Sequence, residues 1–152
     1  MSDMYMSDAE IATGYGAGGK MMKRLNTLLC KISPRYKFYR ICRTIGIEPY
    51  GWQREFALDG YLDGCYNTGF PSGRQTGKTT AVMLRLLMAY PDDSCEVKRI
   101  LSCDPDWRPY DRFRVRWYDS QYYRLSHACF HQGIPVVLLH RIYTPRDLGR
   151  RP

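Results

Sequence analysis

The sequence lacks long hydrophobic runs, paired cysteines and internal repeats. No apolar stretch approaches the roughly 20 residues that a membrane-spanning helix needs. The first ten residues, MSDMYMSDAE, are acidic and polar where a secretory signal would be basic and then apolar. No CxxC pair occurs among the six cysteines, which disfavours a zinc ribbon and a disulfide framework. We therefore expect a cytoplasmic protein with reduced thiols and no membrane partner.

The chain is basic, with a formal net charge of +8 from 23 Lys and Arg against 15 Asp and Glu. Its 152 residues are about the length of one domain. Arginine greatly outnumbers lysine, and the planar guanidinium group binds phosphate through two parallel hydrogen bonds. Charge alone leaves two alternatives open: a nucleic-acid partner, or an arginine-rich surface without one.

The first third of the chain divides into a tail and a basic helical segment. Residues 1–19 lack periodicity and end in a glycine cluster, which predicts a flexible tail. Residues 20–48 form the basic helical segment, in which apolar spacing predicts a helix that ends at Pro34. The next stretch, PRYKFYRICRTIG, alternates basic and aromatic residues. That pattern is typical of base stacking with phosphate pairing, and equally of an amphipathic helix whose aromatic rings face the core.

Residues 49–152 alternate between expected strands and expected helices. We expect helices within 49–61, over 78–90 and in the second half of 112–133. Short apolar or β-branched runs predict strands over 64–70, 96–103 and 134–143. This alternation predicts an α/β layered fold with a parallel sheet.

Residues 71–87, PSGRQTGKTTAVMLRLL, carry the clearest functional motif. A phosphate-binding loop works because backbone N–H groups converge on the phosphates at the positive end of the following helix. Gly77, Lys78 and Thr79 occupy the glycine, lysine and hydroxyl positions of the pattern G-x-x-x-x-G-K-[ST]. In that pattern the lysine reaches the β and γ phosphates and the hydroxyl holds Mg²⁺. The sequence departs from it at Ser72, where a glycine is expected.

The run SGRQTGKT resembles the variant phosphate loop of viral terminase large subunits, the ATPases that pump DNA into capsids, in which an Arg-Gln pair is common. This resemblance implies a P-loop NTPase-like three-layer fold with a partial sheet, ATP and Mg²⁺ as cofactors, and double-stranded DNA as partner. It implies that Lys78 and Arg74 are catalytic, with Arg74 stabilising the γ phosphate. The implied nucleotide-binding residues of the loop are Ser72, Gly73, Arg74, Gln75, Thr76, Gly77, Lys78, Thr79 and Thr80.

Two further residues extend the resemblance. Terminases and related helicases carry a glutamine upstream of the loop that reads the edge of adenine, and Gln53 is in that position, although it could equally be an ordinary helix residue. Hydrolysis also needs a second carboxylate for the metal and a general base. Asp104, beside Asp106, is a candidate metal ligand with Thr79, but the expected strand before it is short and Pro105 separates the two carboxylates.

The expected strand over 134–143 resembles the one that precedes the acidic strand in terminase and helicase cores. On this interpretation residues 49–152 are the N-terminal part of an ATPase core, which a partner chain or an oligomer completes. The alternatives are a non-enzymatic basic nucleic-acid-binding protein and a fragment of a helicase-type ATPase. A small-molecule kinase is less favoured, because no substrate lid or acceptor motif is visible.

Overall fold

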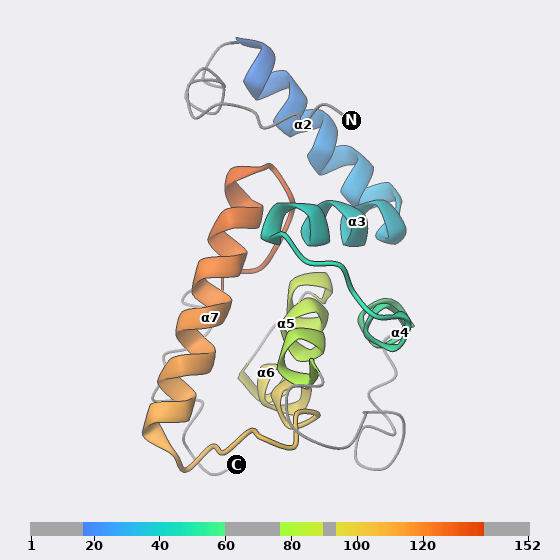
Figure 1. The fold of residues 1–152 in the computed structure, drawn as a ribbon. Helices are drawn as coiled ribbons and strands as arrows, with labels where there is room; N and C mark the ends of the chain where they lie inside the picture. The colour runs from blue at the N-terminus through green and yellow to red at the C-terminus, as the bar shows by residue number, and fades with distance from the viewer. Residues whose placement is uncertain (1–16, 60–76, 90–93, 139–152) are drawn as a thin grey trace, which may run out of the picture.

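The computed structural model describes residues 17–59, 77–89 and 94–138 as helices joined by short connections (Figure 1). The helices are α2 (Ala17–Ile32), α3 (Pro34–Ile45), α4 (Gly51–Asp59), α5 (Lys78–Met88), α6 (Ser94–Leu101) and α7 (Arg112–His131). None of the described residues belongs to a β-strand. The predicted α/β fold with a parallel sheet is therefore wrong, and the described architecture is all-α.

The strand predicted over residues 96–103 is wrong because its apolar residues have helical spacing. Val97, Ile100 and Leu101 are buried, and the intervals of three and four residues place them on one face of α6. Residues 134–138, in the described part of the predicted strand 134–143, have no regular secondary structure. The predicted strand 64–70 and residues 139–143 lie outside the described residues.

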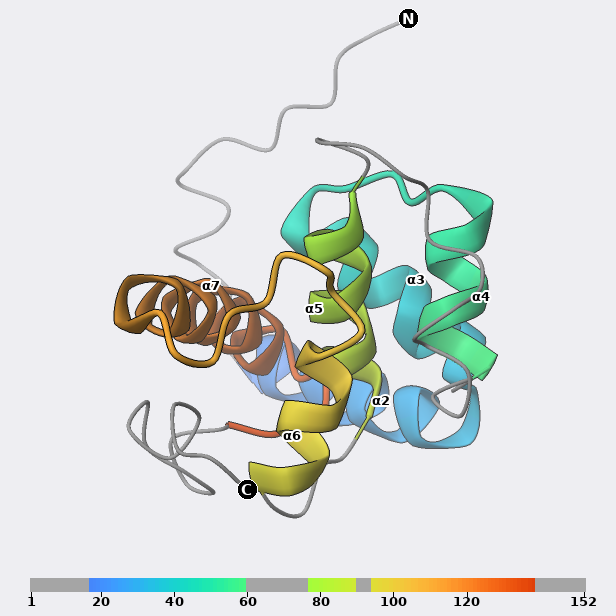
Figure 2. The same cartoon turned by 90° about the horizontal axis from the view of Figure 1, so that it is seen from below.

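Helix α5 lies at the centre of the molecule, as Figure 2 shows, and packs against α3, α4 and α6. Its side chains are buried nearly all the way round: Ala81, Val82, Met83, Leu84, Leu86 and Leu87. A helix that is apolar on all sides is stable only inside a core. Arg85, at the less buried position, donates from Nη1 to the carbonyl of Ala57 at 2.9 Å and so ties α5 to α4.

Both ends of helix α3 are fixed by capping residues. The Ser33 side chain accepts a hydrogen bond from the backbone N–H of Tyr36, Pro34 occupies the first turn, and Gly46 closes the helix with φ of 72°. Phe38, Ile41 and Cys42 then face the core. The predicted helix is therefore present, but of its aromatic residues Phe38 faces the core while Tyr39 is 55% exposed.

Helix α2 contains the helix predicted from residue 20 but begins at Ala17, so residues 17–19 of the predicted tail are helical. Much of its apolar surface faces away from the molecule. Met21, Leu28 and Ile32 are 71%, 57% and 78% exposed, whereas Asn26 and Cys30 on the opposite face are buried. Thr27 Oγ1 donates to the carbonyl of Gly133 at 2.7 Å, which joins α2 to the end of α7. In the described part of the chain, no helix combines the length and apolar character needed to cross a bilayer.

Helix α7 is the longest described element, and it runs along the side of the molecule next to α5 and α6 (Figure 1). The Asp111 side chain caps its N-terminus by accepting from the backbone N–H groups of Phe113 and Arg114. Tyr118 and Tyr122 point into the core. The connection from α6 to α7 carries Asp104, and the packing of α7 therefore decides what surrounds this carboxylate.

Candidate functional site

The N-terminal end of α5 is built from the residues of the glycine-lysine-hydroxyl motif. Gly77 precedes the helix with φ of 83°, a left-handed conformation that favours glycine, and Lys78 and Thr79 form the first turn. Gly77, the N-cap residue, makes no side-chain capping hydrogen bond. The first backbone N–H groups of a helix carry a partial positive charge that suits an anion.

Gln53 fixes the position of Gly77. Gln53 Nε2 donates to the Gly77 carbonyl at 2.9 Å, and Gln53 Oε1 accepts from the backbone N–H of Tyr50 at 2.9 Å. A Cβ atom at position 77 would overlap Gln53 Nε2, so both the backbone angle and the close approach require glycine. Gln53 is only 3% exposed and uses its amide to join α4 to the start of α5. The role of Gln53 in adenine recognition stays a prediction.

The side chain of Thr79, in the first turn of α5, contacts the carboxylate of Asp104. Thr79 Oγ1 donates to Asp104 Oδ2 at 2.7 Å across a sequence separation of 25 residues. Tyr118 OH donates to the same oxygen at 2.5 Å, and the backbone N–H of Asp106 donates to Asp104 Oδ1 at 2.9 Å. The structure therefore brings together the two residues that the sequence suggests as metal ligands.

The surroundings of Asp104 are buried and strongly polar. Asp104 is 1% exposed, and its carboxylate accepts from two hydroxyl groups and one amide. Burial, and then the hydrogen bond to Asp104, raise the pKa of Tyr118 well above its usual range. The phenol therefore stays protonated and acts as a donor. Trp107 packs edge-on against the Tyr118 ring, with 5.1 Å between ring centroids.

The donor set at this end of α5 fits a hard cation. A threonine hydroxyl and a carboxylate are the oxygen ligands that Mg²⁺ uses, usually with substrate phosphates and water completing the shell. In the described ranges, no three His, Cys, Asp or Glu residues cluster into a metal-binding group. Thr79 and Asp104 could thus hold Mg²⁺ together with a bound phosphate, but they do not form a metal cage by themselves.

The other predicted site residues have different placements. Thr80 is partly buried in the first turn of α5, and Asp106 is exposed. The loop residues Ser72, Gly73, Arg74, Gln75 and Thr76 lie outside the described residues.

Sequence reasoning missed Tyr118. Its neighbours Val115 and Tyr122 share its buried face on α7, so the spacing signals a core position. Nothing in the local pattern indicates that its hydroxyl meets Asp104.

No protein-family model matches the chain, and no curated protein or solved structure does either. What the chain does must therefore be inferred from its own residues and their geometry.

Proposed function

We propose that this chain binds ATP together with Mg²⁺ at the N-terminal end of α5. The hydrogen bond between Thr79 and Asp104 carries the proposal. This hydrogen bond places the buried carboxylate of Asp104 beside the hydroxyl of Thr79, the residue that directly follows Lys78. The Lys78 ammonium group, which can bind phosphate, and two oxygen groups that can bind a metal are therefore carried by residues at the same end of α5. A surface Gly-Lys turn would not require this buried partner.

Each residue has a defined role in this proposal. The first backbone N–H groups of α5 and the Lys78 ammonium group bind the phosphate oxygens. Thr79 and Asp104 would hold Mg²⁺, which neutralises charge on the phosphates when it is bound. Gln53 keeps the Gly77 carbonyl in place, so that the chain enters the helix with the N–H groups directed outward.

ATP is proposed over other phosphates because the run from Ser72 to Thr79 resembles the terminase loop. That resemblance and the net charge of +8 also support association with DNA. We propose that a partner chain or an oligomer supplies the general base that hydrolysis needs. The resemblance to terminases concerns the sequence of the loop alone and does not extend to the all-α fold of the described residues.

The alternative is a non-enzymatic protein that binds nucleic acid and uses the same helix end to contact a backbone phosphate. The excess of arginine favours it. Mg²⁺-dependent binding of ATP in the absence of nucleic acid separates the two functions, because a backbone-phosphate contact has no need of a Thr79 and Asp104 metal site.

Titration of labelled ATP with and without Mg²⁺ tests the proposal in wild type and Lys78→Ala. A charge-assisted contact contributes about 1.5–3 kcal/mol, so the variant should bind about 10- to 150-fold more weakly. Lys31→Ala removes the same charge from an exposed position of α2 and should bind like wild type. Equal affinity of folded Lys78→Ala and wild type would rule out the proposed site.

A further inference from the structure

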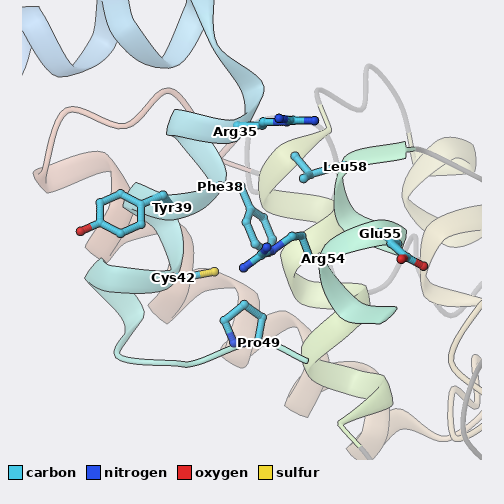
Figure 3. A pocket seen from close by; sticks show the side chains of 8 residues that line it. All are labelled: Arg35, Phe38, Tyr39, Cys42, Pro49, Arg54, Glu55 and Leu58. Atoms are coloured by element: carbon cyan, nitrogen blue, oxygen red, sulfur yellow. The ribbon is translucent and has the colours of Figure 1, made fainter. Parts of the chain in front are cut away.

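A pocket of about 530 Å³ opens between α3 and α4, and neither Gln53 nor Gly77 is among the residues described as lining it (Figure 3). Arg35 and Tyr39 line it from α3, and Arg54 and Glu55 line it from α4. Phe38 is nearly fully buried and forms part of the floor. The volume lies within the usual range for small-ligand sites, about 300–1,000 Å³.

The pocket exists because α3 divides its basic and aromatic residues between two faces. Lys37 and Phe38 turn into the core, whereas Arg35, Tyr39 and Arg43 stay exposed at intervals of four residues and form one stripe. Arg43 Nη1 donates to Tyr39 OH at 2.9 Å, which restricts the orientation of the ring. The alternation of charge and aromatic rings in the sequence thus yields a core face and a separate surface face.

The charges in the pocket are available to a ligand. The guanidinium groups of Arg35 and Arg54 have no hydrogen-bond or ion-pair partner within the described residues. Cys42 also lines the pocket, and burial, opposed by the nearby charge of Arg54, raises its pKa to about 11. The thiol is therefore neutral near pH 7, and among the described lining residues Glu55 is the one acidic side chain.

We propose that this pocket binds a nucleotide unit of single-stranded nucleic acid, with its phosphate on Arg35 and Arg54 and its base against Tyr39. Guanidinium groups pair with phosphate oxygens in a bidentate fashion, and an exposed aromatic ring stacks on any base. A simple anion would not need the aromatic ring or the apolar floor.

Single-stranded rather than duplex nucleic acid fits because an exposed aromatic ring and two guanidinium groups line the same recess. In a duplex the base faces are stacked on one another, so only the phosphates could reach Arg35 and Arg54. An acidic peptide could pair with the same arginines, but it would gain nothing from the ring of Tyr39. The proposal rests on the proposed association with nucleic acid and is independent of ATP binding.

Fluorescence anisotropy with a labelled oligothymidylate of about 15 nucleotides, and with a duplex of the same length, tests this pocket. Arg35→Gln combined with Arg54→Gln should weaken single-strand binding at least 10-fold and lower the salt slope by about 0.7, the value for one phosphate contact on a single strand. Arg112→Gln combined with Arg116→Gln removes two exposed arginines of α7 as a matched control, and its loss should be several-fold smaller. Equal losses in the two double variants would overturn the proposal.

A second pair of variants tests the stacking contact. Tyr39→Ala should weaken the single strand about 5- to 100-fold, and Tyr39→Phe should retain most of the affinity because the ring remains. Because Tyr39 is 55% exposed, both variants should keep the wild-type melting temperature. An unchanged affinity of Tyr39→Ala, or an equal loss of duplex binding, would contradict a base-stacking site.

Competition identifies the source of the ligand. Displacement of the oligonucleotide by unlabelled single strand at far lower concentration than by free thymidine monophosphate supports a nucleic-acid site. Equal displacement by the free nucleotide, or displacement by oligoglutamate alone, contradicts it. Mg²⁺-ATP titration of the pocket variants should give the wild-type affinity, so failure here and failure of the ATP site are separate results.

Discussion

Thr79 and Asp104 are joined by a hydrogen bond of 2.7 Å although 25 residues separate them in the sequence. Thr79 lies in the first turn of the central helix α5, and Asp104 lies in the connection from α6 to α7. Because α5 packs against α6, the chain can return to the start of α5 shortly after α6 ends. A buried carboxylate at this place is costly unless hydrogen bonds or a cation compensate it, and the hydroxyls of Thr79 and Tyr118 supply two of those bonds.

The proposed metal site predicts that Asp104→Asn uncouples ATP binding from Mg²⁺. The amide oxygen can still accept from Thr79 and Tyr118, while the amide nitrogen cannot accept the bond that Asp104 Oδ1 receives from the Asp106 N–H. The variant is therefore checked for folding by its melting temperature, and it loses the negative charge that attracts the metal. We expect the increase in ATP affinity on adding Mg²⁺ to fall about 10-fold or more. Isothermal titration calorimetry at a series of Mg²⁺ concentrations measures this.

Asp106→Asn is the matched control for Asp104→Asn, because it makes the same change two residues away on an exposed side chain. It should keep the wild-type dependence on Mg²⁺. A folded Asp104→Asn protein with an unchanged dependence on Mg²⁺ would remove Asp104 from the site.

The contact between Gln53 and Gly77 predicts that Gly77→Ala destabilises the protein. Alanine must adopt φ near 83°, which costs about 1–2 kcal/mol, and its Cβ displaces the Gln53 amide from its two hydrogen bonds. We expect a loss of about 2–4 kcal/mol in the free energy of unfolding, measured with urea.

Gln53→Ala separates the two causes in a double-mutant cycle. Once the amide is absent, Gly77→Ala should cost only the backbone strain, so the two changes together should cost less than their sum by about 1 kcal/mol or more. Strict additivity would show that the amide does not restrict position 77.

The contrast between α5 and α2 predicts losses of very different size from the same substitution. Leu86 is 1% exposed in the core, and Leu28 is 57% exposed on α2. Leu86→Ala should lower the free energy of unfolding by about 2–5 kcal/mol, and Leu28→Ala by about 0.5 kcal/mol or less. Urea denaturation at two protein concentrations provides the comparison. A large, concentration-dependent loss in Leu28→Ala would mean that the face of α2 is covered by self-association in solution.

Helices with strong local signals could be predicted from the sequence. Pro34 and Gly46 bound α3, and the apolar run after Lys78 forms α5 as expected. The strand predicted over 96–103 failed because short apolar runs carry similar local signals in strands and in buried helices. There the helical intervals between Val97, Ile100 and Leu101 decide the structure.

The candidate site could be predicted in its parts but not in its assembly. Gly77, Lys78 and Thr79 are adjacent in the sequence, so their motif can be recognised from the sequence alone. The partners of Thr79 come from distant segments, and only the packing of α6 and α7 brings Asp104 and Tyr118 to it. Pairing across such separations depends on tertiary structure, which periodicity does not encode.

Buried Lys37 predicts a stability that depends on pH in a defined direction. Lys37 is 2% exposed, and its Nζ lies 3.4 Å from the Met88 carbonyl. Burial lowers its pKa from 10.5 to about 8, an effect that Cys30 and Cys129 oppose. Below about pH 8 the ammonium group is charged in both states, and the folded state bears the full cost of burying it. Between about pH 8 and 10.5 the unfolded chain binds more protons than the folded protein, so this contribution to the free energy of unfolding rises with pH.

Lys37→Met isolates the contribution of Lys37, because methionine is unbranched and uncharged. The comparison is needed because burial raises the pKa values of the Cys30 and Cys129 thiols, which lowers stability as pH rises in both proteins. The Lys37 charge lowers these two pKa values, so its loss in the variant raises them further and also makes the advantage of the variant shrink as pH rises. Relative to wild type, the variant should gain up to about 3 kcal/mol near pH 7, and this difference should shrink as the pH approaches 10. Urea denaturation of both proteins from about pH 7 to about pH 10 measures it, with Lys31→Met, on exposed α2, as a control that should show no such trend. A difference between Lys37→Met and wild type that stays constant over this range would show that Lys37 keeps its ordinary pKa in the folded protein.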